Sequence, residues 1–293
     1  MAATNCFHYH LATIFSLAIL SLPPLAFPAT FTFVNQCSYT VWPGILSNAG
    51  TAQLSTTGFS LSSGASLPVP VPPSWSGRMW GRTLCSLNPD TGRFACLTGD
   101  CGFGAIECAG GGAATPATLA EFTLDGAGGL DFYDVSLVDG FNLPMLVSPR
   151  GGGGGGNCTV TGRAVDLNAR CPAELRAAGG GGCRSACEAF GEAKYCCSGE
   201  YATPDTCGPS EYSAAFKSAC PRAYSYAYDD GTSTFTCASA DYVITFCPAP
   251  STSEKSSERS SSALLVSSGG DLRVKPSFWS IFAIFVAAMY VAV

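Results

Sequence analysis

Three cysteines and an aspartate stand close together in the segment GRFACLTGDCGFGAIEC, residues 92–108. Thiols at this spacing could bind a metal ion, carry out redox chemistry or close loops as disulfides. The two histidines of the chain, His8 and His10, lie in a segment that indicates a removable signal peptide. The chain that remains would have no histidine, which excludes His-ligated metals and the Ser-His-Asp and Cys-His catalytic pairs. We therefore expect disulfides from the cysteines, and we expect no metal and no cofactor.

The first 29 residues predict a secretory signal peptide. The apolar run 11–25 is short for a membrane span, and small residues that suit cleavage follow it, with Ala29 as one cleavage position. Prolines near the end of the run argue against the alternative of a buried N-terminal helix. The absence of Lys and Arg before the run departs from the usual signal-peptide pattern, and the cleavage position stays open, because cleavage after Ala29 puts the bulky Phe27 at position −3. Export would bring the cysteines into an oxidising compartment, where thiols become disulfides.

The sequence after the last cysteine changes in composition. Residues 251–270 are rich in serine and have no apolar period, which predicts a disordered linker. Residues 271–293 combine a polar spacer with an apolar run, the pattern of a signal for attachment of a glycosylphosphatidylinositol (GPI) anchor. A retained membrane tail is the alternative, although the run is slightly short for a span. The candidate attachment sites are Ser267, Ser268 and Gly269.

Residues 30–250 indicate an all-β domain. Short alternating or β-branched runs are separated by Gly and Pro, which favours a sandwich or a flattened barrel. The runs are FTFVNQ, YTVWPGI, LPVPV, MWGRT, AEFTL, DFYDVSLV, TFTC and YVITFC. The segment PSEYSAAFKSAC predicts a helix that Ser210 can cap at its start. Its apolar face at helical spacing would consist of Tyr212, Ala215, Phe216 and Ala219.

The segment at 92–108 resembles the signature of the thaumatin-like family, the pathogenesis-related group five proteins of plants. Similar stretches, from TFTFVNQCSYTVWPG to CPRAYSYAYDDGTSTFTC, extend the resemblance over residues 30–248, and the C-terminal pattern suggests a GPI-anchored type of member. The resemblance implies a flattened β-sandwich, a disulfide-rich helical second region and a small looped third region. The sandwich would comprise residues 30–82, 122–164 and 221–250, the helical region 165–220 and the looped region 83–121.

Seven disulfides are implied by the same resemblance. They are Cys37–Cys247, Cys85–Cys96, Cys101–Cys108, Cys158–Cys237, Cys171–Cys183, Cys187–Cys196 and Cys197–Cys207. Where the family has a further cysteine, five residues after Cys158, this chain has Arg163, so Cys220 is left outside the seven pairs. Loss of such a bridge costs about 2–5 kcal/mol in small secreted domains. The remaining thiol would either bridge to another molecule or be buried and inert, and we favour the buried thiol.

The family's usual functional surface is an acidic cleft between the sandwich and the helical region. The resemblance assigns it to Arg78, Glu121, Asp134, Asp139 and Asp229, with Arg82 and Asp230 as alternatives. Carboxylates beside aromatic rings suit a neutral carbohydrate, whose hydroxyls donate to carboxylates and whose apolar faces stack on rings. Two carboxylates can also hydrolyse a glycosidic bond without histidine, with Glu121 as the acid and Asp134 or Asp139 as its partner.

Three functions follow from this reading, and the first is favoured. They are an extracellular plant defence-type, antifungal protein whose cleft binds β-1,3-glucan, a weak endo-β-1,3-glucanase, and a cell-wall or surface interaction protein that does not use the cleft. The net charge of −6 disfavours nucleic acid and anionic membranes, so membrane contact is expected through the lipid anchor only. We expect a monomer, and Asn157 in the sequence NCT predicts a glycosylation site.

Overall fold

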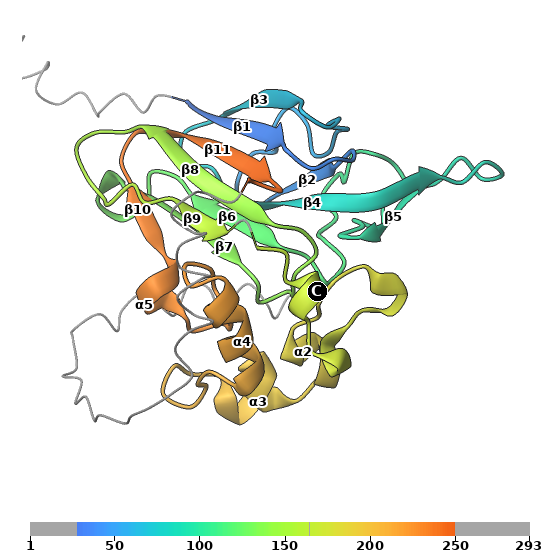
Figure 1. The fold of residues 1–293 in the computed structure, drawn as a ribbon. Helices are drawn as coiled ribbons and strands as arrows, with labels where there is room; N and C mark the ends of the chain where they lie inside the picture. Colours follow the sequence, from blue (N-terminus) through green and yellow to red (C-terminus); the bar gives the residue numbers. More distant parts are fainter. Residues whose placement is uncertain (1–27, 164, 250–293) are drawn as a thin grey trace, which may run out of the picture.

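A computed structural model describes residues 28–163 and 165–249 of the chain (Figure 1). Outside these residues lie most of the predicted signal peptide (1–27 of its 29 residues), the predicted linker at 251–270 and the predicted GPI signal at 271–293. The attachment sites Ser267, Ser268 and Gly269 therefore also lie outside them. Within the described ranges, no helix has the length and apolar character needed to cross a membrane.

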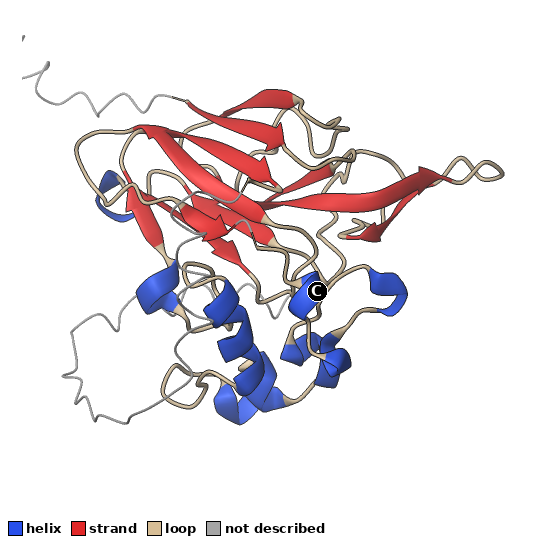
Figure 2. Ribbon diagram, viewed as in Figure 1, coloured by secondary structure: helices blue, strands red, loops and turns tan. Residues whose placement is uncertain are grey.

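Two β-sheets make up most of the described chain (Figure 2). One sheet has the strand order β3-β1-β11-β8-β9, and the other has the order β10-β7-β6-β4-β2, with β5 paired to β4. Neighbouring strands are antiparallel except β1 and β11, which are parallel. The strands are β1 (Ala29–Asn35), β2 (Trp42–Ser47), β3 (Ser66–Val71), β4 (Ser76–Leu87), β5 (Phe94–Thr98), β6 (Leu119–Thr123), β7 (Asp131–Ser136), β8 (Met145–Gly151), β9 (Thr161–Arg163), β10 (Phe235–Cys237) and β11 (Ala240–Phe246).

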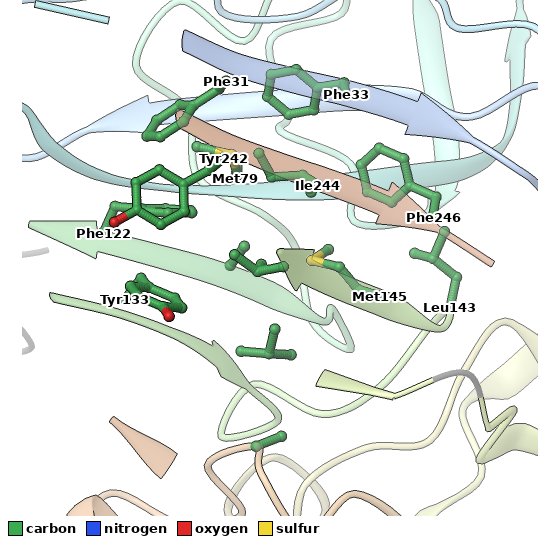
Figure 3. Packing of buried hydrophobic residues seen from close by; sticks show 14 of the residues in the cluster. Phe31, Phe33, Met79, Phe122, Tyr133, Leu143, Met145, Tyr242, Ile244 and Phe246 are labelled. Atoms are coloured by element: carbon green, nitrogen blue, oxygen red, sulfur yellow. The ribbon is translucent and has the colours of Figure 1, made fainter. Parts of the chain in front are cut away.

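Aromatic side chains fill the space between the two sheets (Figure 3). Phe31 and Tyr242 come from the first sheet, and Phe122 and Tyr133 come from the second. The ring centroids of Phe31 and Phe122 lie 4.5 Å apart, and those of Phe122 and Tyr242 lie 5.0 Å apart. Because alternate residues of a strand point to the same face, these rings determine which face of each strand is inward. The predicted all-β sandwich is confirmed.

Three strands, β5, β8 and β9, were not predicted from the sequence. The run MLVSPRG of β8 contains Pro149, a residue that cannot donate a hydrogen bond to a neighbouring strand. Proline is tolerated here because β9 pairs only with residues 145–147, so β8 has a single neighbour, β11, at Pro149. The strand β8 is therefore central in the sheet at its start and at the sheet edge at its end. Such a strand has no single sequence pattern along its length.

The helices lie on the side of β6 and β7 that is turned away from the first sheet (Figure 1). They are α2 (Ala186–Phe190), α3 (Ala193–Cys196), α4 (Glu211–Ala219) and α5 (Asp230–Ser233). Short 3-10 turns are η1 (Ala127–Gly129), η2 (Asn168–Arg170), η3 (Ala173–Leu175), η4 (Ala178–Gly180) and η5 (Gly199–Tyr201). These helices and 3-10 turns are shorter than the roughly 12–15 residues that an isolated helix needs to be stable in water. The helical region therefore depends on tertiary packing and on its disulfides.

The predicted helix α4 is confirmed, together with its cap. The Ser210 hydroxyl accepts a hydrogen bond from the Ser213 N–H at 3.2 Å, and the Ser213 hydroxyl accepts one from the Ser210 N–H at 2.8 Å. The predicted buried face is partly wrong, because Ala215 is exposed while Ser213 and Phe216 are buried. The reciprocal cap turns Ser213 inward, and this rotates the buried face away from Ala215.

Seven disulfides join the described residues, and they are the seven pairs that the resemblance implies. Cys220, which belongs to none of them, is 4% exposed at the end of α4. The expected burial of Cys220 is confirmed, and the inertness of its thiol stays a prediction. Arg163 is half-buried at the end of β9, and its Nε has no hydrogen-bond partner among the described residues.

Candidate functional site

Three charged residues form one row across neighbouring strands of the second sheet. Arg78 of β4 is the register partner of Glu121 of β6, and Glu121 is the partner of Asp134 of β7. Directly opposed residues of antiparallel strands point to the same face, with Cβ atoms about 4.5–5.5 Å apart. The neighbours of Glu121, Ala120 and Phe122, lie in the core between the sheets. The row therefore lies on the outer face of this sheet, which faces the helices (Figure 1).

Asp139 joins this row from the turn that follows β7. Its carboxyl interacts electrostatically with Arg78 and with Glu121. The next residue, Gly140, has φ 84°, a left-handed conformation that glycine adopts without steric cost. A Cβ atom at Gly140 would lie 2.7 Å from the carbonyl oxygen of Cys183, so the turn packs closely on the helical region. We call Arg78, Glu121, Asp134 and Asp139 the carboxylate cluster.

Burial raises the pKa of each carboxyl in the carboxylate cluster. For Glu121, loss of hydration raises the pKa, the Arg78 guanidinium lowers it, and the charge of Asp139 raises it. Burial, followed by the charges of Glu121 and Asp230, raises the pKa of Asp134 well above its ordinary value. Burial also raises the pKa of Asp139, and Arg78 opposes this shift. Such a site can keep a proton on one carboxyl while another is ionised.

The two adjacent aspartates, Asp229 and Asp230, have different surroundings. The Asp229 Oδ2 atom lies 2.9 Å from Lys217 Nζ and accepts hydrogen bonds from the N–H and hydroxyl of Ser225. Its charge is therefore balanced by a lysine of α4. Asp230, in contrast, acts electrostatically on Asp134. The resemblance assigns Asp229 to the cleft with Asp230 as its alternative, and this assignment stays a prediction.

Two residues beside the carboxylate cluster were not predicted from the sequence, Glu188 of α2 and Tyr224. Burial raises the pKa of Glu188, and a hydrogen bond from Thr115 opposes the rise. The Tyr224 hydroxyl donates to Asp230 Oδ1 at 2.7 Å, and burial together with the charge of Asp134 raises its pKa. Neither residue belongs to a recognisable motif, so only the three-dimensional arrangement reveals its position.

Arg82, the alternative for the arginine of the cleft, has a different role. It is completely buried, its Nε donates to the Trp42 carbonyl at 2.9 Å, and its Nη2 donates to the Ile106 carbonyl at 2.5 Å. Burial lowers the pKa of Arg82 to about 10. The side chain thus fastens the looped region to β2, and Arg78 is the arginine of the carboxylate cluster.

Replacing Asp134 with asparagine is expected to stabilise the fold at neutral pH by on the order of 1–3 kcal/mol. Asp134 Oδ1 is buried without a hydrogen-bond partner among the described residues, so its ionised form is poorly solvated. The raised folded-state pKa means that the native state is progressively destabilised as the pH rises above 3.8, the ordinary value, and through the raised value. Thermal unfolding should show a gap between variant and wild type that widens from acidic to neutral pH.

Asp90→Asn is the control for this measurement, because Asp90 is exposed in the loop between β4 and β5. It should leave the unfolding temperature nearly unchanged at every pH. A stabilisation by Asp134→Asn that did not depend on pH would contradict its attribution to the poorly solvated, ionised carboxylate of Asp134.

Asn157, the predicted glycosylation site, is exposed beside the Cys158–Cys237 disulfide. Its Oδ1 atom is 3.4 Å from the Thr236 N–H, a long hydrogen bond that leaves the amide accessible. Glycosylation at this residue stays a prediction.

Residues 35–248 match the family model described as the Thaumatin family. The chain belongs to the thaumatin family. Thaumatin-like protein 1 of Arabidopsis thaliana is 61% identical over 225 residues, which covers 75% of this chain and 86% of that protein. Thaumatin-like protein 1 of Pyrus pyrifolia is 54% identical over 237 residues, which covers 79% of this chain and 96% of that protein.

A further relative within the thaumatin family has a name that states an activity. A protein of Prunus avium named glucan endo-1,3-beta-glucosidase is 52% identical to this chain over 238 residues. The aligned stretch covers 80% of this chain and 96% of the cherry protein. It therefore includes all the strands that carry the carboxylate cluster.

Proposed function

We propose that this member of the thaumatin family acts outside plant cells in defence and binds β-1,3-glucan at the carboxylate cluster. The observation that carries the proposal is the row formed by Arg78, Glu121 and Asp134 on the outer face of the second sheet. Half-buried carboxyls on a rigid sheet can accept hydrogen bonds from sugar hydroxyls without first becoming ordered, which favours binding. The helices lie on the same side of this sheet as the row (Figure 1).

Charge supports a neutral polysaccharide over the charged alternatives. The chain has a net charge of −6, and the cluster contains one arginine among several acidic groups. Phosphates of nucleic acids and anionic lipids would be repelled by this surface. A glucan has no charge, so it meets no such barrier, and its hydroxyls can donate to ionised carboxylates.

Retention on insoluble β-1,3-glucan tests the proposal. The full-length secreted protein should bind the glucan, and Glu121→Gln and Asp139→Asn should each weaken retention about tenfold, since each removes a carboxyl that hydrogen-bonds to sugar hydroxyls, at a loss of about 1.4 kcal/mol. Asp90→Asn removes an exposed carboxylate in the loop between β4 and β5 and should be retained like the wild type. If both cluster variants were retained as strongly as the wild type, the carboxylate cluster would not be the glucan-binding site. This result would favour a surface interaction protein that does not use the cleft.

Weak endo-hydrolysis of β-1,3-glucan is the second candidate function. The raised pKa of Glu121 favours it, because a carboxyl that stays protonated can donate to a leaving glycosidic oxygen. Asp134, its register partner, and Asp139 are the candidates for the second carboxylate. The name of the cherry relative supports this candidate.

We also propose that a GPI anchor holds the protein at the outer face of the plasma membrane or in the cell wall. The support comes from the sequence of residues 267–293, which lies outside the described residues. Phosphatidylinositol-specific phospholipase C should release the protein from a plant membrane fraction. Protein that stays in the membrane pellet after this treatment would instead indicate a membrane-spanning tail.

A further inference from the structure

A hollow of about 370 Å3 lies between α3 and the start of α4. Ligand pockets commonly have volumes of about 300–1,000 Å3, so the hollow is large enough for a sugar ring. A narrower recess shares Tyr195 with the hollow and continues to Val138, the residue before Asp139. None of the residues of the carboxylate cluster lines either space. The residues of the hollow that can contact a ligand are Lys194, Tyr195, Tyr201, Thr206, Ser210 and Glu211.

The wall of the hollow is fixed before any ligand arrives. The Cys197–Cys207 disulfide closes the loop that carries Tyr201. The Tyr228 hydroxyl donates to the Ala202 carbonyl at 2.7 Å, which ties this loop to the segment that leads into α5. A preorganised wall loses little conformational entropy when it binds a ligand.

Aromatic rings give the hollow an apolar surface. Tyr195 packs on Tyr212, with ring centroids 5.7 Å apart, and Lys194 Nζ lies 4.6 Å from the Tyr195 ring centroid. Tyr201 is half-buried and makes no ring contact with the other aromatic residues that the structure describes. Tyr201 lines the hollow, and its ring is the aromatic group that we assign to stacking on a ligand.

The charges of the hollow select against anions. Lys194 Nζ lies 2.8 Å from Glu192 Oε2, so the cation already has a partner. Glu211 adds an acidic group to the lining itself. A phosphate or a carboxylate would find no excess positive charge here, whereas a neutral polyhydroxylated ring finds both acceptors and an apolar surface.

We propose that this hollow is a saccharide subsite that binds one neutral hexopyranose unit against Tyr201. The inference rests on the proposed function, because the unit belongs to the same β-1,3-glucan chain that binds at the carboxylate cluster. The recess beside the hollow reaches Val138, which precedes Asp139 of the cluster in the chain, so a glucan chain would cross the surface between the two positions. A glucan long enough to reach both positions binds more tightly than a disaccharide, which can occupy only one.

Calorimetric titration of the full-length secreted protein with β-1,3-linked glucose oligomers tests this subsite. Tyr201→Ala should weaken binding of a hexasaccharide about tenfold, or about 1.4 kcal/mol, and should leave the weaker binding of a disaccharide at the cluster unchanged. Tyr201→Phe keeps the ring and should retain the wild-type affinity. Tyr39→Ala is the matched control, because Tyr39 is 46% exposed on the sandwich beside Cys247. Unchanged thermal unfolding would show that each variant is folded.

The outcomes separate the subsite from the cluster. If Tyr201→Ala binds the hexasaccharide like the wild type while Glu121→Gln binds it weakly, the subsite is wrong and the proposed function stands. If Tyr201→Ala binds weakly while Glu121→Gln and Asp139→Asn are unchanged, the subsite is right and the cluster is not the binding site. Absence of binding by the wild type overturns both.

Discussion

Arg82→Ala is expected to lower the free energy of unfolding by about 3–5 kcal/mol, the largest stability effect that we predict. The Arg82 guanidinium is completely buried and donates to the carbonyls of Trp42, Pro43 and Ile106. Alanine leaves these acceptors buried without a donor, at about 1–3 kcal/mol for each unsatisfied group, and also leaves a cavity. Water that enters the vacated space offsets part of this loss.

Chemical denaturation of the full-length secreted protein measures this effect. Arg82→Lys should recover only part of the stability, because an ammonium group cannot reproduce the fork of donors that a guanidinium presents. Arg150→Ala serves as the control, because Arg150 is exposed near the end of β8. A loss below about 1 kcal/mol for Arg82→Ala, the range of an ordinary surface substitution, would contradict the structural role assigned to Arg82.

Glu121→Gln is expected to have the largest effect on hydrolysis of β-1,3-glucan. Release of reducing sugar from laminarin should fall about 100-fold or more, since a general acid contributes about 10²–10⁴-fold. Only the protonated form of Glu121 can donate, so the wild-type rate should fall as the pH rises through the raised pKa of Glu121. The variant should lack this dependence, because glutamine does not titrate in this range.

A comparison of Asp134→Asn with Asp139→Asn identifies the partner carboxylate. Substitution of the aspartate that acts as nucleophile or base should lower the hydrolysis rate as severely as Glu121→Gln does. Substitution of the other aspartate should lower the rate much less. Carboxyls about 5 Å apart predict retention of configuration at the anomeric carbon, and a separation of about 6.5–9.5 Å predicts inversion. Wild-type activity that all three substitutions leave unchanged would rule out hydrolysis by the carboxylate cluster and leave binding as its role.

The strands that could be predicted from the sequence are those with one continuous pattern. Phe31 and Phe33 of β1 alternate with less buried residues, and so do Tyr133 and Val135 of β7, because one face of each strand is buried throughout. The strand β8 changes its surroundings along its length, and β9 has three residues, so neither contains a repeat that a local pattern can detect.

The site could be predicted only in part, for a related reason. The family resemblance supplied Glu121, Asp134 and Asp139, but their alignment with Arg78 depends on strand register, which tertiary packing sets. Asp229 and Asp230 are adjacent, and the contact that distinguishes their surroundings, the ion pair of Asp229 with Lys217, comes from α4. Such contacts join distant parts of the chain and leave no local signal in the sequence.

The parallel pair of β1 and β11 has a mechanical consequence for a protein held by its C-terminal end. The two strands run side by side, and the Cys37–Cys247 disulfide links the residues just beyond their ends across a sequence separation of 210. Tension applied after Cys247 would pass through a covalent bond to Cys37 instead of peeling β11 from the sheet. If the proposed GPI anchor holds the chain, the sandwich would keep its shape, and the carboxylate cluster would stay intact under load.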